Sequence, residues 1–140
     1  MLILSQRHYD KIVTHCLNGL PNEACGLLGG IIAGAQKTVQ EIYPLTNLDH
    51  SPEHFAMDPK EQFQAVKAMR TNGWVLLGNF HSHPSTPARP SEEDKRLAFD
   101  PGASYLIVSL AEQGNPVLKS FNIQNGVAAE EKITLNGEEQ

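Results

Sequence analysis

Long apolar runs, a basic leader and a cysteine framework are all missing from this sequence. No apolar stretch approaches the roughly 20 residues that a transmembrane helix needs. Residues 1–7 have no basic segment ahead of their apolar residues, so we expect no secretory signal peptide. The two cysteines, Cys16 and Cys25, are too few for a disulfide framework. These features predict a cytoplasmic protein whose cysteines are reduced and buried.

Basic residues are scarce as well. The 11 lysines and arginines are outnumbered by 16 aspartates and glutamates, which gives a formal net charge of −5. The basic residues are scattered, whereas a protein that binds a phosphate backbone normally has a basic patch or stripe. We therefore expect neither nucleic acid nor a membrane among the partners of this chain.

Length and composition favour a single folded domain. A chain of 140 residues can bury a core of its own, and a hydrophobic content of 40% argues against disorder or a fibre. We find no internal repeat and no interdomain linker. The sequence predicts one domain over residues 1–140, with an acidic tail at about 136–140 that contains Glu138 and Glu139.

Hydrophobic periodicity and turn residues predict an α/β fold. Ser5 is placed to cap a helix that begins near Gln6, and Pro59 opens a second helix whose inward residues should be Phe63, Val66 and Met69. A third, short helix should start at Ser91. Strands are predicted at 23–30, 37–43, 74–81, 105–110, 117–123 and 127–135, the last two joined by an Asn125–Gly126 hairpin turn. This order favours one mixed sheet flanked by helices.

Two histidines stand at the end of the strand predicted at 74–81, whose nearly continuous apolar residues predict that it is covered on both faces. His81 and His83 are two residues apart, so on a strand they point to the same side and can reach one ion, while Ser82 faces the other way. Metal ligation is one interpretation of this pair. Ordinary hydrogen-bonded histidines are the other.

The run from Ser91 to Asp94 also has two interpretations. It matches a helix capping box, with Ser91 at the N-cap and an acidic residue three positions later. Asp94 in that first turn can still direct its carboxylate at a cation, and the prolines between His83 and Ser91 would fix the distance between strand end and helix start.

Two imidazoles and one carboxylate would suit catalytic zinc. Such a set leaves the fourth tetrahedral position to water, whose pKa falls toward roughly 7 on the metal. A structural zinc site would need a fourth protein ligand, and no cysteine pair has suitable spacing. Glu23, ahead of an apolar strand, is the candidate proton acceptor, although it can also be read as an exposed turn carboxylate.

Other signals are weaker. The run from His50 to His54 matches a His-x-x-Glu-His zinc pattern that requires a helix, but Pro52 lies inside it. We expect a loop there, near the cleft. Cys25 has no recognisable histidine partner, so we expect a buried strand residue and not a nucleophile. His8 and His15 are expected at the surface of the first helix.

The combined motif resembles the JAMM/MPN+ (JAB domain) metallopeptidase family, in its small stand-alone prokaryotic form. His81-Ser82-His83-Pro84, followed by Ser91 and Asp94, is similar to the signature His-x-His, seven residues, Ser, two residues, Asp. Glu23, in the run Asn22-Glu23-Ala24-Cys25-Gly26, is similar to the segment that carries the family's catalytic glutamate. The resemblance covers most of the chain.

The resemblance implies a fold and a role for each residue. The fold would be the three-layer α/β/α, cytidine-deaminase-like MPN domain with a mixed central sheet. His81, His83 and Asp94 would bind one Zn²⁺. Glu23 would act as general base toward the water and pass its proton to the leaving amine, while Ser91 would stabilise the oxyanion.

The resemblance also implies a substrate class. Related enzymes cleave the bond after the C-terminal Gly-Gly of ubiquitin or ubiquitin-like proteins, and the short connection at 99–102 favours a sulfur-carrier protein over polyubiquitin. Two alternatives remain open: a non-catalytic MPN-type scaffold for protein partners, and a zinc amidase acting on small or cell-wall peptides. The sequence does not indicate an oligomeric state.

Overall fold

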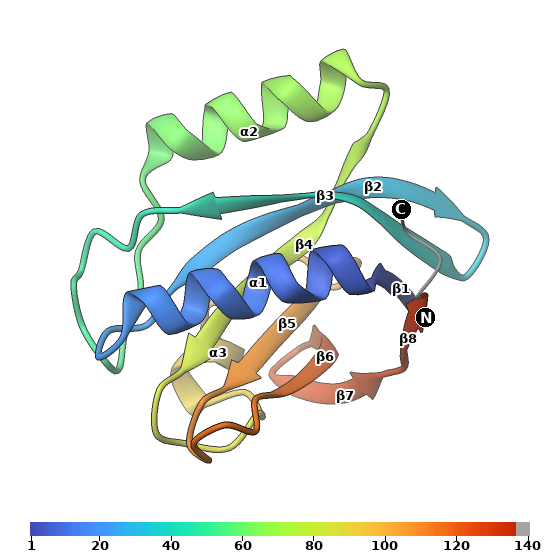
Figure 1. The fold of residues 1–140 in the computed structure, drawn as a ribbon. Coiled ribbons are helices and arrows are strands. Elements are labelled where there is room, and N and C mark those ends of the chain that lie inside the picture. Colours follow the sequence, from blue (N-terminus) through green and yellow to red (C-terminus); the bar gives the residue numbers. More distant parts are fainter. Residues whose placement is uncertain (137–140) are drawn as a thin grey trace.

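The computed structural model describes residues 1–136, which contain one eight-stranded mixed sheet and three helices (Figure 1). Across the sheet the strands follow the order β7-β6-β5-β4-β2-β3-β1-β8. Along the chain the elements are β1 (Leu2–Ser5), α1 (Gln6–Gly19), β2 (Cys25–Ala33), β3 (Gln36–Leu45), α2 (Pro59–Thr71), β4 (Val75–His83), α3 (Glu92–Arg96), β5 (Ser104–Ser109), β6 (Val117–Gln124), β7 (Val127–Glu131) and β8 (Ile133–Asn136).

Helices cover both faces of this sheet. The ribbon in Figure 1 shows α1 and α2 on opposite sides of the central strands. α1 packs on one face, where Ile12 and Cys16 join Phe80 in a buried cluster. α2 covers the other face through Ala65 and Met69. Burying an apolar stripe of each helix against the sheet gives the predicted three-layer α/β/α arrangement and its mixed sheet.

The local signals for helix ends are confirmed. The Ser5 hydroxyl accepts a hydrogen bond from the amide of His8 at 3.0 Å, which caps α1. Asp58 caps α2, and Pro59 occupies its first turn, where the missing amide proton costs nothing. Side-chain placement on α2 differs from the prediction: Phe63 is 70% exposed, and Ala65 takes the buried position beside Met69.

The two ends of the chain pair in a way that the sequence did not predict. The segment 127–135 is not one strand, because it breaks at Lys132 into β7 and β8. β7 pairs with β6 through the predicted hairpin, whereas β8 runs parallel to β1 at the far edge of the sheet. β1 was not expected at all, since four residues ahead of a capped helix show too little alternation to identify a strand.

Exposure corrects two further expectations. β4 is not covered on both faces throughout, because Val75 and Leu76 at its start are each 48% exposed. The histidines of α1 are not surface residues: His8 is buried, and His15 reaches the carbonyls of Cys25 and Leu45 at 3.0 and 3.2 Å. His15 thus ties α1 to the end of the sheet that holds the candidate site.

Two sequence expectations concern membranes and the tail. Among residues 1–136, none of the helices has the length and apolar character needed to cross a bilayer. The predicted acidic tail at 136–140, with Glu138 and Glu139, lies outside the described residues except for position 136, which ends β8.

The position of β4 depends on a close backbone approach at Gly78. A Cβ atom there would collide with the backbone of Ser104, the residue that pairs with Gly78 on β5. We therefore expect Gly78→Ala to lower the free energy of unfolding by about 3 kcal/mol or more, as severe overpacking does. Urea denaturation measures this.

Gly102→Ala is the matched control, because its nearest neighbour would be the Asp100 carboxylate at 3.4 Å. A substitution in such open surroundings should change stability by no more than about 0.5 kcal/mol. Equal stability of the two variants would contradict the close packing of β4 on β5.

Candidate metal centre

His81 and His83 lie at the C-terminal end of β4, on the face of the sheet that α2 covers. Their rings share one side because strand residues alternate, and both residues are buried, at 3% and 5% exposed. Ser82 points to the opposite face, where its hydroxyl accepts a hydrogen bond from the amide of Ala24 at 2.8 Å. The prediction that the two imidazoles converge is confirmed.

The capping box of α3 carries Asp94 to the same point. The Ser91 hydroxyl accepts from the Asp94 amide at 3.0 Å, and the Asp94 carboxylate accepts from the Ser91 amide at 2.9 Å. The same oxygen, Oδ2, lies 3.2 Å from His81 Nε2 and 3.1 Å from His83 Nε2. Both interpretations of Ser91 to Asp94 therefore hold together: Asp94 caps its helix and faces the histidines.

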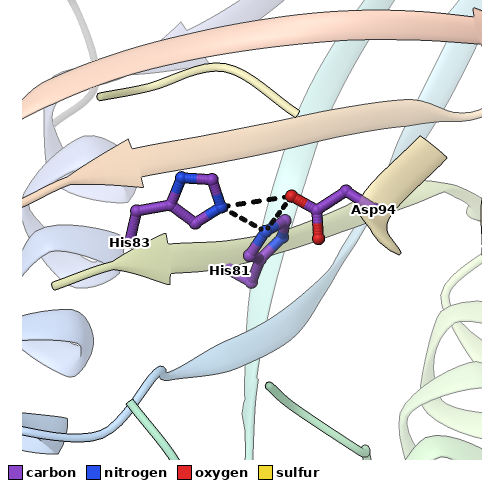
Figure 2. Close-up of side chains that lie close together, drawn as sticks. All are labelled: His81, His83 and Asp94. Carbon is purple, nitrogen blue, oxygen red and sulfur yellow. Dashed lines mark hydrogen bonds and ion pairs between the residues drawn. The ribbon is translucent and has the colours of Figure 1, made fainter. Parts of the chain in front are cut away.

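Figure 2 shows the three side chains converging, the histidines from β4 and Asp94 from α3. The two Nε2 atoms lie 3.2 Å apart. Four tetrahedral ligands about 2.0–2.1 Å from a zinc ion lie roughly 3.3 Å from one another. The three atoms thus have the spacing of ligands that share one ion, and the group is positioned to bind a metal.

The tautomer of His83 supports this fit. Its Nδ1 lies 2.9 Å from the carbonyl oxygen of Pro87, which can only accept, so Nδ1 carries the proton. Nε2 is therefore the nitrogen that faces Asp94: it donates to the carboxylate when the ring is protonated, and in the neutral ring its lone pair is available to a cation. A carbonyl partner on the far nitrogen is typical of metal-binding histidines.

The loop between His83 and Ser91 is held in place by the end of β5. Ser109, at the end of β5, donates its hydroxyl proton to the carbonyl of Thr86 at 2.6 Å, and Ala88 is buried. This contact holds the carbonyl of Pro87 in place for His83. The proline-rich link therefore keeps the strand end and α3 at a fixed separation, as the sequence predicted.

Charges in the cluster are strongly coupled. Burial alone would raise the pKa of Asp94, but hydrogen bonds with His81 and His83 hold that pKa well below its usual range. For His83, burial alone would lower the pKa, whereas the hydrogen bonds to Asp94 and Pro87 raise it. The site thus keeps a carboxylate ionised in buried surroundings, which suits a cation.

Glu23 stands beside this cluster, ahead of β2. It shares an open cleft of about 380 Å³ with His83, Ser91 and His54. Burial raises the pKa of Glu23 to about 8; the charge of His83 opposes that shift and the charge of Asp94 adds to it. A carboxyl group with a pKa near neutrality, in a cleft next to a group that is positioned to bind a metal, is suited to proton transfer.

A family model described as "Prokaryotic homologs of the JAB domain" matches residues 5–124 of this sequence. The chain belongs to this JAB-domain family. The three-layer fold and the order of its elements are those expected of the family's MPN domain.

Curated relatives support the same assignment. The sequence is 33% identical over 135 residues to the CysO-cysteine peptidase of Mycobacterium bovis, a match that spans 96% of this chain and 91% of that protein. It is 33% identical over 105 residues to the desampylase of Haloferax volcanii, spanning 71% of this chain and 74% of that protein. The expectation of a JAMM-type hydrolase family is thereby confirmed.

A solved relative supports the fold over the full length. The solution structure of a Desulfitobacterium hafniense protein matches with a TM-score of 0.91 and 60% sequence identity. The match covers 99% of this chain and 94% of that one.

Two residues of this JAB domain were not assigned a role from the sequence. Phe55 stacks on the His81 ring, with centroids 4.6 Å apart and planes at 23°. His54 was expected near the cleft, and its Nδ1 lies 2.7 Å from a Glu93 carboxylate oxygen. Residues 52–54 line the cleft, so the expected position of His54 is confirmed, whereas His50 is not part of that lining. No helix forms over residues 50–54. Only the run of loop-forming residues around Pro52 hinted at this position.

The structure agrees with the expectation that Cys25 is a buried strand residue and not a nucleophile. Cys25 is buried on β2, and burial raises the pKa of its thiol to about 12, with the charges of Glu61 and Glu23 adding to the shift. A thiol with so high a pKa is protonated at neutral pH and is a poor nucleophile.

Metal binding by Asp94, which the geometry predicts, can be tested separately from its capping of α3. Loss of an outer-sphere partner alone costs about 10–100-fold in metal affinity, so we expect loss of the ligand in Asp94→Asn to weaken Zn²⁺ binding by at least about 100-fold. Zinc competition against a chromophoric chelator measures the affinity.

Ser91→Ala is the matched control, since it removes the cap of α3 and leaves the three donor atoms. It should lose about 1 kcal/mol of stability and bind zinc within a few-fold of the unmodified protein. Unchanged zinc affinity in Asp94→Asn would exclude Asp94 as a ligand.

Proposed function

We propose that this JAB-domain protein is a zinc-dependent peptidase or isopeptidase that cleaves the bond after the C-terminal Gly-Gly of a ubiquitin-like sulfur-carrier protein. The observation that carries the proposal is the convergence of His81, His83 and Asp94 beside a cleft that also holds Glu23. In this proposal His81, His83 and Asp94 bind one zinc ion, and Glu23 and Ser91 are catalytic.

The donor set favours zinc among divalent ions. Imidazole nitrogen suits zinc, whereas magnesium and calcium prefer oxygen ligands throughout. Two imidazoles and one carboxylate also match the protein ligands of catalytic zinc sites, which leave a further position for water or substrate. When bound, the ion would supply Lewis acidity toward water and the scissile carbonyl.

The residues of this chain would provide the proton transfers. Glu23 would take a proton from the attacking water at its carboxylate and deliver it to the nitrogen of the leaving amine. The raised pKa supports this shuttle, because a carboxyl group that titrates near neutral pH both accepts and releases a proton readily. General acid–base catalysis of this kind contributes about 10²–10⁴-fold to a rate.

Ser91 would stabilise the charge that develops on the carbonyl oxygen. Its hydroxyl oxygen accepts from the amide of Asp94, which orients the group and leaves its own proton to donate. Ser91 is exposed and lines the same cleft as Glu23. One preorganised donor of this kind is worth about 10²–10³-fold in turnover.

The substrate class rests on the relatives and on the cleft. The relatives are named as a CysO-cysteine peptidase, a desampylase and a probable TtuB-protein conjugate cleaving protease, and we extend their substrate class to this chain. Residues 52–54 and Glu93 of α3 line the cleft beside the site, and we expect a substrate tail with small side chains to fit between them. Glycines in the substrate tail would meet that requirement, because they carry no side chain.

The two alternative functions are less well supported. A non-catalytic scaffold would have no need of three donor atoms at ligand spacing or of a carboxyl group with a pKa near neutrality. A small-amide or cell-wall hydrolase would share the metal centre but would not require a glycine tail. The domain span 1–140 and the cytoplasmic location stay predictions from the sequence.

Glu23→Gln should separate turnover from metal binding. We expect this variant to keep one zinc per chain and to cleave a ubiquitin-like protein with a Gly-Gly junction at least about 100-fold more slowly, because only the proton acceptor is lost. Single-turnover cleavage and metal analysis of the same samples give both quantities.

Glu53→Gln is the matched control, since Glu53 lines the same cleft but is an exposed loop residue. Its cleavage rate should stay within a few-fold of that of the unmodified protein.

The substrate class is tested by changing the junction of the substrate from Gly-Gly to Ala-Ala, which should resist cleavage. Full activity of Glu23→Gln would refute the mechanism, and equal cleavage of both junctions would refute the substrate class.

A further inference from the structure

The main chain around Glu23 is held by the loop at 47–57. The amide of Glu23 donates to the carbonyl of Ser51 at 2.8 Å, and the carbonyl of Glu23 accepts from the side-chain amide of Asn47 at 2.9 Å. Both backbone polar groups of the proposed general base are therefore bonded to one loop. The position of the carboxyl group depends on the conformation of that loop.

Asn47 also holds the loop together. It is 9% exposed, and its amide nitrogen donates a second bond to the carbonyl of His54 at 3.0 Å. Its side-chain oxygen accepts from the amides of Asp49 and Ala56, both at 3.0 Å. With two donor and two acceptor bonds, the amide of Asn47 is fully used.

The loop closes on itself around this side chain. Asn47 and Met57 form an isolated antiparallel bridge, and the amide of Leu48 donates to the carbonyl of Ala56 at 2.8 Å. The closed loop carries Phe55, which stacks on His81, and His54, which pairs with Glu93 of α3. One buried amide thus connects the proposed base with the wall of the cleft.

We propose that Asn47 is a positioning residue for Glu23: its amide fixes the backbone of the general base and, through the same loop, the Phe55 and His54 wall of the cleft. The proposal rests on the proposed function for its catalytic part. Asn47 contacts no metal donor atom, so its loss should leave zinc bound. Misplacement of a reacting group by about 1 Å costs up to about 10²-fold in rate.

A double-mutant cycle in zinc-loaded protein tests the catalytic part. We expect Asn47→Ala to lower kcat by about 10–100-fold with KM changed less than about threefold. In a Glu23→Gln background the same change should cost at most a few-fold further, because the general base is already absent and only the effect on the cleft wall remains. Equal losses in both backgrounds would overturn the proposal, since a general structural defect lowers both alike.

Two further variants keep the result interpretable. Asn47→Asp retains both acceptor bonds of the loop but places an oxygen against the carbonyls of Glu23 and His54, so it should show at least the same loss of kcat. Far-UV circular dichroism and the protection of the α2 amides establish that this variant is folded. Asn122→Ala is the control, since it also deletes a bond between a side-chain amide and a backbone carbonyl, to Ala103 at 3.2 Å, on a remote part of the sheet. Its kcat should be unchanged.

Hydrogen exchange tests the positioning without any substrate. In Asn47→Ala, the hydrogen-bonded amides of Glu23, Leu48, Asp49 and Ala56 should exchange at least about tenfold faster, while those of α2 keep their protection. In Asn47→Asp, the faster exchange should be seen at Glu23 and Leu48. Protection of Glu23 that persists while the loop opens would overturn the proposal. If the variants show this exchange pattern but the unmodified protein cleaves no Gly-Gly junction, the proposed function alone is refuted.

Discussion

The antiparallel pairing of β2 with β4 places the candidate catalytic groups side by side. Cys25 stands opposite His81, and one step further the amide of Ser82 donates to the carbonyl of Ala24 while the Ser82 hydroxyl accepts from the amide of Ala24. These two hydrogen bonds of Ser82 hold the segment that contains Glu23 against the strand that contains both histidines. A shift of this register by one residue would turn the histidines to the wrong face.

Around that pairing, each side of the cleft is contributed by a different connection. The parallel pair β4–β5 requires a crossover, and this crossover carries the proline-rich loop and α3 with Asp94. The connection from β3 to α2 carries the loop that holds Glu23. The strand β4 thus presents the histidines, and the β4–β5 crossover carries Asp94 to them. Glu23 lies in the connection from α1 to β2 and is held in place by the loop between β3 and α2. This division accounts for a site built from residues distant in sequence.

The central part of the site could be predicted from sequence because its signals are local. Alternation places His81 and His83 on one face, and a capping box places Asp94 in the first turn of α3. The position of Glu23 next to these residues could be predicted only from the family resemblance. In the structure that position depends on hydrogen bonds of residues 23 and 24 with Asn47 and Ser82, which are distant in the sequence. The prediction of one strand over 127–135 and the prediction of an inward Phe63 were wrong for a similar reason. The β1–β8 pairing and the exposure of Phe63 both depend on tertiary contacts that local patterns do not encode.

The central claim is that two imidazoles and one carboxylate hold a single ion and leave it open to water. X-ray absorption spectroscopy of the zinc-loaded protein tests this most directly. The structure predicts two imidazole nitrogens and oxygen ligands at about 2.0–2.2 Å, with no sulfur. A sulfur ligand at about 2.3 Å, or a third imidazole, would mean that the ion is held by other residues than His81, His83 and Asp94.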